Sequence, residues 1–207
     1  MTEYYYTQNP DVLHEKTQWQ FKLLSHNLTF NSDNGVFSKR TIDFGTRTLL
    51  DAVDLEDLKQ GDVLDVGCGY GPIGLAIAKA IDDVHVDLVD VNLRALDLCK
   101  QNAAQNGIQN IEIWESDTYE AVSKKNYHTI LSNPPVRAGK PVVTKILTGA
   151  FDHLQVGGSL LIVLQKKQGA PSAKKTMTQT FGNAEIILKQ KGYYIIKSVK
   201  EKVVDAK

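Results

Sequence analysis

The sequence lacks several features that mark specialised classes of protein. It has only two cysteines, Cys68 and Cys99, and their spacing matches no metal-ligand motif. It has no apolar run of membrane-spanning length, no internal repeat and no low-complexity tract. The polar, tyrosine-rich N-terminus shows no signal-peptide pattern. These absences argue against a disulfide scaffold and predict a cytoplasmic protein with free thiols, without a metal or a membrane partner.

The sequence also lacks net charge, which argues against a generic nucleic-acid binder. The charges are nevertheless unevenly distributed. Residues 1–136 contain 11 Lys and Arg against 20 Asp and Glu, a net charge of −9, whereas residues 137–207 contain 13 against 4, a net charge of +9. Two interpretations of the basic half stay open: a surface that faces a polyanion, or a solvated lysine-rich face.

The length of 207 residues suits one α/β domain with a small appendage. Apolar runs of strand type alternate with helical patterns, which indicates a mostly parallel, doubly wound sheet with helices on both faces. We expect seven strands, and the last two must be antiparallel because their connection is too short for a crossover helix. The expected strands of this sheet are 63–66, 84–89, 111–114, 127–131, 159–164, 184–188 and 193–199, and the expected helices are 46–53, 72–80, 92–106, 142–154 and 173–181.

Residues 1–45 are predicted to form an N-terminal arm and a β-hairpin packed on a core domain of residues 46–207. Alternating apolar residues at 19–23 and 28–30 indicate the two strands of the hairpin. The arm contains Tyr4-Tyr5-Tyr6, which would either stack on nucleic-acid bases or dock on the protein's own surface.

The most informative stretch runs from Val63 to Lys79 and combines a buried strand, a glycine-rich turn and the start of a helix. Such a turn at the carboxyl end of a parallel strand is typical of a small-molecule site. Residues 69–74 satisfy the G-x-G-x-x-G dinucleotide fingerprint, which is a weak signal by itself. Asp65, Gly67, Gly69 and Gly71 also form D-x-G-x-G-x-G, whose carboxylate would repel a pyrophosphate and attract a cationic ligand; Asp65 could alternatively cap a turn.

Polar residues follow three further strands at the same edge of the sheet. Asp90 ends the second strand, where an acid can accept hydrogen bonds from ribose hydroxyls. Asp117 follows the third strand and either accepts from an adenine amino group or acts as a loop residue or helix cap. Asn133-Pro134-Pro135-Val136 follows the fourth strand. Its prolines remove two N–H donors, so backbone carbonyls and the Asn133 oxygen form a group of acceptors suited to a planar amine.

Together these residues resemble an amino-directed class I S-adenosylmethionine-dependent methyltransferase. The segments Asn34–Lys39 and Ile42–Thr46, together with Gln165–Gly169, resemble more specifically the small-domain methyltransferases, which include the guanine-N2 methyltransferases of small-subunit ribosomal RNA. The similarity covers nearly the whole chain from about residue 18.

The resemblance implies a Rossmann-like methyltransferase fold, S-adenosylmethionine as cofactor and ribosomal RNA as partner. It implies that the cofactor-binding residues are Asp65, Gly67, Gly69, Gly71, Asp90, Val91, Asp117 and Asn133, that Asn133, Pro134 and Pro135 are catalytic, and that Phe37, Val136, Lys166 and Lys167 bind substrate. It leaves the oligomeric state open between monomer and homodimer.

The chain departs from its larger RNA-modifying relatives in two respects. Those relatives carry a second, N-terminal domain, and many have Tyr or Phe where this chain has Val136. Phe37 could replace that aromatic ring or belong to the core. The runner-up activity is methylation of a protein glutamine or of a small-molecule amine. A nicotinamide-dependent oxidoreductase would leave Asp65 and Asn133 without a role, and a non-catalytic RNA-binding module would leave the glycine turn unused.

Overall fold

In the computed structural model, residue 8, residue 13, residues 15–38 and residues 40–202 are described. Tyr4-Tyr5-Tyr6 and most of the expected arm lie outside these residues. Nine strands form a two-stranded hairpin and a seven-stranded sheet within the described part of the chain. They are β1 (Thr17–Leu23), β2 (His26–Ser32), β3 (Val63–Val66), β4 (Val86–Asp90), β5 (Ile111–Glu115), β6 (Tyr127–Ser132), β7 (Leu154–Gln165), β8 (Glu185–Gln190) and β9 (Tyr193–Val199).

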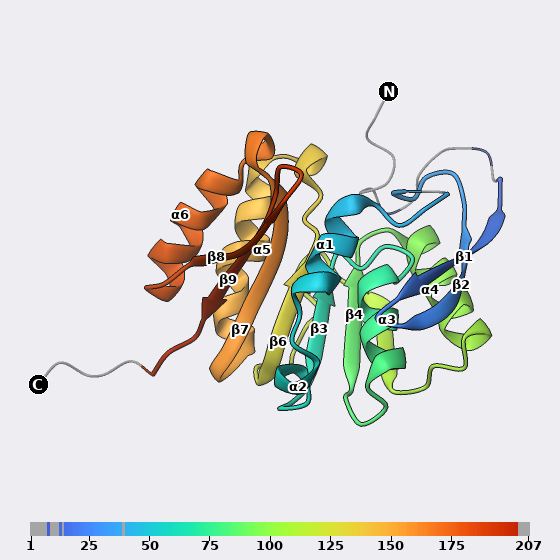
Figure 1. Cartoon of the computed structure of the whole chain (residues 1–207), viewed down its shortest axis with the longest axis horizontal. Helices are drawn as coiled ribbons and strands as arrows, with labels where there is room; N and C mark the ends of the chain where they lie inside the picture. The colour runs from blue at the N-terminus through green and yellow to red at the C-terminus, as the bar shows by residue number, and fades with distance from the viewer. Residues whose placement is uncertain (1–7, 9–12, 14, 39, 203–207) are drawn as a thin grey trace, which may run out of the picture.

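The seven-stranded sheet has the order β5-β4-β3-β6-β7-β9-β8. The strands from β5 to β7 are parallel, and β9 is antiparallel to both of its neighbours. The expected fold class, a mostly parallel seven-stranded sheet with an antiparallel C-terminal strand and an N-terminal hairpin, is therefore confirmed. Figure 1 shows this sheet with helices on both sides. The helices are α1 (Phe44–Ala52), α2 (Leu55–Leu58), α3 (Pro72–Ala80), α4 (Leu93–Gln105), α5 (Lys140–His153) and α6 (Ala170–Phe181), with 3₁₀ turns η2 (Val136–Ala138) and η3 (Lys166–Gln168).

The core is divided into two apolar clusters, one on each face of the sheet. Consecutive side chains of a strand point to opposite faces, so Val63 belongs to one cluster and Leu64 to the other. The first cluster lies under α1, α3, α4 and the hairpin, and the second lies under α5 and α6. All residues of β3 and β6 are buried, as expected of central parallel strands that are covered on both faces.

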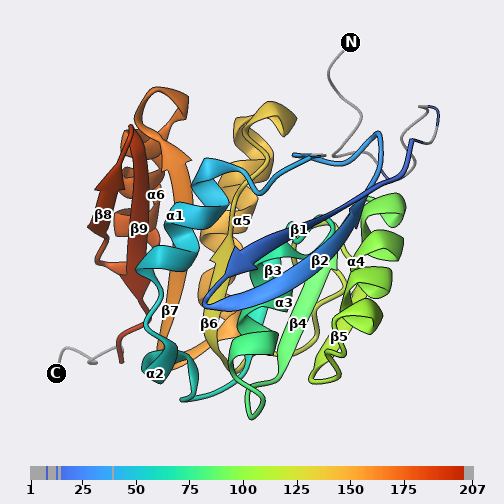
Figure 2. The ribbon, with the colours of Figure 1, turned by 45° about the vertical axis from the view of Figure 1, so that its right-hand side comes forward.

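The hairpin is attached to α4 by two asparagine side chains that substitute for a neighbouring strand. Asn102 Oδ1 accepts from the Asn31 N–H at 2.6 Å, and its Nδ2 donates to the Asn31 carbonyl at 3.1 Å. Asn106 makes the equivalent pair with Thr29 at 2.9 and 2.8 Å. These bonds satisfy backbone groups along the edge of β2 and place the hairpin beside α4 (Figure 2). The domain division at residue 45 stays a prediction.

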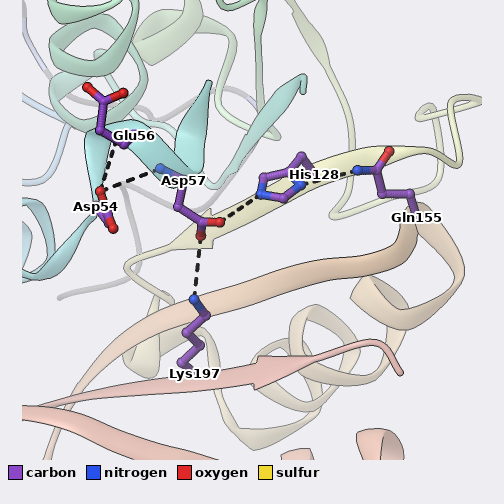
Figure 3. Close-up of polar contacts among 6 residues, drawn as sticks. All are labelled: Asp54, Glu56, Asp57, His128, Gln155 and Lys197. Atoms are coloured by element: carbon purple, nitrogen blue, oxygen red, sulfur yellow. Dashed lines mark hydrogen bonds and ion pairs between the residues drawn. The ribbon is translucent and has the colours of Figure 1, made fainter. Parts of the chain in front are cut away.

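Helix α2 is a short element that the sequence patterns do not predict, and polar contacts hold it to the sheet (Figure 3). Asp57 Oδ1 lies 3.1 Å from His128 Nε2, and Asp57 Oδ2 lies 3.5 Å from Lys197 Nζ. The Gln155 amide nitrogen, a donor, lies 3.1 Å from His128 Nδ1, which assigns the proton of the neutral imidazole to Nε2. This network is formed by residues that do not line the cavity described below.

Asp65 lies in β3 between Leu88 of β4 and Leu131 of β6, and it is fully buried. Its Oδ2 accepts from the Gly74 N–H at 2.9 Å, which holds the first turn of α3 against the sheet. Its Oδ1 has no hydrogen-bond partner among the described residues. Burial raises the pKa of Asp65 from 3.8 to about 7; the Gly74 bond opposes this rise, and the charge of Asp90 adds to it.

This burial predicts a pH dependence of stability that can be measured with the Asp65→Asn variant. Between pH 3.8 and about 7 the folded state keeps a proton on Asp65 that the unfolded state has lost. Stability therefore falls as pH rises through this window, by about 4 kcal/mol in total for a carboxyl group with this difference in pKa. The substituted amide keeps an oxygen acceptor for Gly74 and carries no charge. Urea unfolding from pH 4.5 to 8 should show the variant gaining stability relative to the wild type; a pH-independent difference would contradict the buried ionisation.

Candidate active site

The glycine-rich turn follows β3 directly and forms one wall of a cavity. Gly67, Gly69 and Gly71 have φ values of 75°, 58° and 95°, which favour glycine over other residues. A Cβ on Gly67 or Gly69 would meet no heavy atom within 4 Å, whereas a Cβ on Gly71 would lie 2.6 Å from Cys99 Sγ. The first two glycines thus keep bare backbone beside open space, and the third allows α3 to pack closely against α4.

Asp90 shapes this turn from the end of β4. Its Oδ2 accepts from the Gly69 N–H at 2.8 Å, and its Oδ1 accepts from the Asn92 N–H at 2.9 Å. Burial raises the pKa of Asp90, against the effect of these backbone donors. The Val91 N–H is a third backbone donor to this carboxylate, which leaves one of its four acceptor positions open, and the residue lines the cavity.

The Asn-Pro-Pro corner reaches the same cavity because β6 lies next to β3 in the sheet. Ser132 ends β6, and its hydroxyl donates to the Val66 carbonyl at 2.7 Å. This bond joins the ends of the two strands at the point where each chain segment leaves the sheet. Asn133, Pro134 and Pro135 follow immediately and line the same cavity as the start of the glycine turn.

The orientation of the Asn133 amide is determined by Asp43, which caps α1, and by Thr46 of that helix. Its Nδ2 lies 3.3 Å from each carboxylate oxygen of Asp43 and 3.0 Å from Thr46 Oγ1. A carboxylate only accepts, so the nitrogen must face Asp43 and the amide oxygen is left as an acceptor. Asp43 also caps α1 by accepting from the Thr46 N–H at 3.1 Å.

Phe37 lies at the cavity in a loop that other elements hold in place. The Asn92 side chain donates to the Gly35 carbonyl at 3.0 Å, and the Tyr70 hydroxyl donates to the Ser38 carbonyl at 3.2 Å. Phe37 is 48% exposed and lines the cavity together with Val136. Phe37 therefore lies outside the buried core, and its role in binding substrate stays a prediction.

The cavity has a volume of about 400 Å³ and gathers most of the site residues expected from the sequence. Those that line it are Phe37, Gly67, Gly69, Asp90, Val91, Asp117, Asn133, Pro134, Pro135 and Val136. Asp65, Gly71, Lys166 and Lys167 do not line it. Asp117 lies on its wall with a half-exposed side chain, 3.3 Å from Lys145 Nζ of α5.

The structure adds lining residues to which the sequence assigns no role in binding, although some lie in the segments Ile42–Thr46 and Gln165–Gly169 that carry the family resemblance. They include Asp43 and Thr46 of α1, Ser116 and Thr118 beside Asp117, Arg137 of η2, Gln165 and Gln168 around η3, and Tyr193 of β9. Asp43 does have a local signal, because an acidic residue before Gly45-Thr46 at the start of a helical pattern indicates an N-cap. Its contact with Asn133, 90 residues away, has no such signal.

One group among the described residues has the composition of a metal site, and it lies apart from this cavity. Ligand atoms of His85, Asp87 and Glu112 lie within 4.8 Å of one another. Asp87 is already engaged by His85 at 2.9 Å and by the Tyr127 hydroxyl at 2.6 Å. None of the three residues lines the cavity, and the expectation of a metal-free site stays a prediction. Within the same described part, no helix is both long and apolar enough to cross a membrane.

Comparisons with known proteins identify the family of the chain. The family model for the methyltransferase small domain matches residues 27–197. A protein of Bacillus subtilis, described as "Uncharacterized protein YbxB", is 47% identical over 97% of this chain and 100% of its own length. Ribosomal RNA small subunit methyltransferase C of Haemophilus influenzae is 36% identical over 84% of this chain. The match spans about half, 51%, of that larger relative.

A solved structure shares the fold. The Thermus thermophilus 16S rRNA N2 G1207 methyltransferase, in complex with AdoMet and guanosine, superimposes with a TM-score of 0.80. Its sequence is 23% identical, and the superposition covers 90% of this chain and 51% of that one. The family model covers most of the chain, and the Bacillus relative, which is matched over its whole length, is identical at nearly half of the aligned positions. The chain belongs to the methyltransferase small domain family.

Proposed function

We propose that this protein is an S-adenosylmethionine-dependent methyltransferase that acts on the exocyclic N2 amine of guanine in small-subunit ribosomal RNA. The observation that carries this proposal is the single cavity bordered by both the glycine turn and the Asn133 corner. A donor and an acceptor bound at these two walls would meet in one space, which is the arrangement that a direct transfer needs.

The residues on the donor side fit a nucleoside joined to an amino acid. Bare backbone at Gly67 and Gly69 leaves room for close approach, as the open space at their Cβ positions indicates. Asp90 would accept from ribose hydroxyls, Asp117 from the adenine amino group, and Val91 would pack on the ring. Asp65 would contribute indirectly, because its hydrogen bond to the Gly74 N–H holds the start of α3 beneath the turn. When bound, the cofactor supplies a methyl group made reactive by the adjacent sulfonium charge.

The acceptor side suits a planar amine that carries two hydrogens. The Asn133 oxygen and the Pro134 carbonyl would each accept one N–H, which turns the nitrogen lone pair out of conjugation with the ring. In-line attack would then form the new C–N bond while the bond between the methyl carbon and sulfur breaks and leaves its electron pair on a neutral thioether; the nitrogen would release its extra proton to solvent afterwards. The chain therefore needs no strong base, and its task is orientation and exclusion of water, which supply about 7–11 kcal/mol in favourable cases.

Asp43 supports guanine as the acceptor base. The two residues are neighbours in the wall of the cavity, so the Asp43 carboxylate and the Asn133 oxygen are both acceptors on that wall. Guanine presents donors at both N1 and N2 along one edge. Adenine and cytosine present a ring acceptor beside their amino group, and that acceptor would face the Asp43 carboxylate. Because a carboxylate cannot donate, this wall favours guanine.

Ribosomal RNA as the substrate is supported by the relatives and by the charge of the C-terminal half. The Haemophilus relative, which is more than 30% identical, is a methyltransferase of small-subunit ribosomal RNA. Lys166 and Lys167 lie between Gln165 and Gln168, which both line the cavity, so exposed cations stand close to its rim. Cations in this position would contact phosphates of a bound strand.

Replacing Asn133 should separate transfer from donor binding. The Asn133→Ala variant loses the amide acceptor at the amine, and turnover should fall about a hundredfold because the amine loses its alignment. Donor affinity, measured by calorimetric titration with S-adenosylmethionine, should stay within about twofold of wild type because Asp90 and the glycine turn are intact. Turnover equal to that of the wild type would remove Asn133 from the reaction.

Replacing Asp90 should affect donor binding first. Asp90→Ala removes a carboxylate that holds Gly69 and would hold the ribose, and hydrogen bonds to charged groups contribute about 1.5–3 kcal/mol each. Donor affinity should therefore fall at least about tenfold in the same titration. Asp97→Ala is a matched control, because Asp97 is an exposed carboxylate of α4 that does not line the cavity. Equal affinities of the Asp90 and Asp97 variants would contradict the assignment.

The base itself can be identified by mass analysis of nucleosides. Ribosomal RNA and small ribosomal subunits that lack the modification are incubated with the protein and S-adenosylmethionine, then digested. We expect one N2-methylguanosine per molecule, which should disappear with Asn133→Ala. Methylation of adenine or cytosine instead would overturn the selectivity assigned to Asp43, and label in protein only would favour the runner-up activity.

A further inference from the structure

An aromatic and basic surface lies beside the acceptor side of the cavity and has no role in the mechanism above. Phe44 of α1 and Tyr193 of β9 have ring centroids 5.5 Å apart, inclined at 51°. Arg47 Cζ lies 5.2 Å from the Phe44 ring centre, and Lys191 Nζ lies 5.0 Å from it. We call these four residues the Phe44 platform. It brings two cations and two rings together from segments about 145 positions apart.

The Phe44 platform lies next to the residues that hold the Asn133 side chain. Tyr193 lines the cavity, and so do Asp43 and Thr46, which hold the Asn133 amide. The Tyr193 ring packs against α1 at Gly45. A glycine makes this packing possible, because a Cβ at position 45 would lie 2.9 Å from Tyr193 Cε1. The Tyr193 ring therefore rests on the backbone of α1, immediately beside the residues that orient Asn133.

Further cations extend the platform along the rim. The Lys166 N–H donates to the Gly192 carbonyl at 2.8 Å, which joins η3 to the β8–β9 turn that carries Lys191. Figure 1 shows this turn beside the beginning of α1. Lys166, Lys167 and Lys191 are all exposed. The rim thus presents a run of positive charge that ends at two aromatic rings.

We infer that the Phe44 platform binds a nucleotide that neighbours the target guanine in a single-stranded or opened segment of RNA. Arg47 and Lys191 would contact its phosphates, and the exposed part of the Phe44–Tyr193 pair would stack on its base. This assignment rests on the proposed RNA substrate. Single-stranded RNA supplies charge and π-faces together, and sites that bind it combine cations with aromatic rings. An acidic peptide would use the cations and leave the rings without a matching group.

The test measures RNA binding separately from methyl transfer. A short fluorescein-labelled single-stranded RNA with one guanine is titrated with the full chain saturated with S-adenosylhomocysteine, and anisotropy is recorded at several salt concentrations. The variants are Lys191→Gln, which changes an exposed turn residue, and Phe44→Leu, which keeps apolar volume. Lys175→Gln is the matched control, since Lys175 is an exposed lysine of α6 that does not line the cavity. Donor titration verifies that each variant is folded.

Phe44→Leu should weaken RNA binding about tenfold through loss of stacking. Lys191→Gln should weaken it and lower the salt slope by about 0.7. The control should bind like the wild type. Wild-type affinity in both platform variants would overturn the platform and leave the proposed methylation intact. Equal competition by polyglutamate, which has charge and no bases, would also overturn it. Absence of N2-methylguanosine in the nucleoside analysis would instead refute the proposed function, whatever the binding data show.

Discussion

The hydrogen bond between the Ser132 hydroxyl and the Val66 carbonyl, 2.7 Å long, marks the constraint on which the site depends. It joins the ends of β3 and β6, two parallel strands that are neighbours in the sheet and more than 60 residues apart in sequence. Each strand releases its chain at the same edge, so a glycine turn and an Asn-Pro-Pro corner face one cavity. The other residues of the site are arranged around the turn and the corner, which the adjacent strands β3 and β6 bring together.

Asp65, which lies beneath the glycine turn, lowers the stability of the fold when it is ionised. Burial in a central strand raises the pKa of its carboxyl group, and the ionised group opposes folding. Its hydrogen bond to Gly74 fixes the first turn of α3, and Asp90 fixes Gly69 from the adjacent strand. The two acids therefore hold the turn at both ends and repel one another across it. A cationic ligand beside the turn would relieve this repulsion, and its binding would then stabilise the fold.

The sequence is informative where a site is built from contiguous residues and much less so where distant segments meet. Gly67 to Gly71 and Asn133 to Pro135 are local patterns whose backbone consequences follow from glycine and proline chemistry. Apart from Gly71, these residues line the cavity. Asp65 does not line the cavity, and the alternation of side chains along β3 explains why. Asp65 shares a face of the strand with Val63 and points toward α3. Contacts of Asp43 with Asn133 and of Phe44 with Tyr193 depend on how α1 packs, which no periodic pattern encodes.

The division of charge along the chain acquires a spatial meaning in this fold. The acidic part, residues 1–136, supplies Asp43, Asp90 and Asp117 to the wall of the cavity. The basic part supplies one cation, Arg137, to that wall and places Lys166 and Lys191 at its rim. A polyanion would be attracted by the rim and repelled by the interior. Among the groups of a nucleic acid, an uncharged one with hydrogen-bond donors, such as the amino edge of a base, would gain by passing from the rim to the interior. If RNA is the substrate, as proposed, the same charge separation would attract its backbone and keep its phosphates away from the cavity.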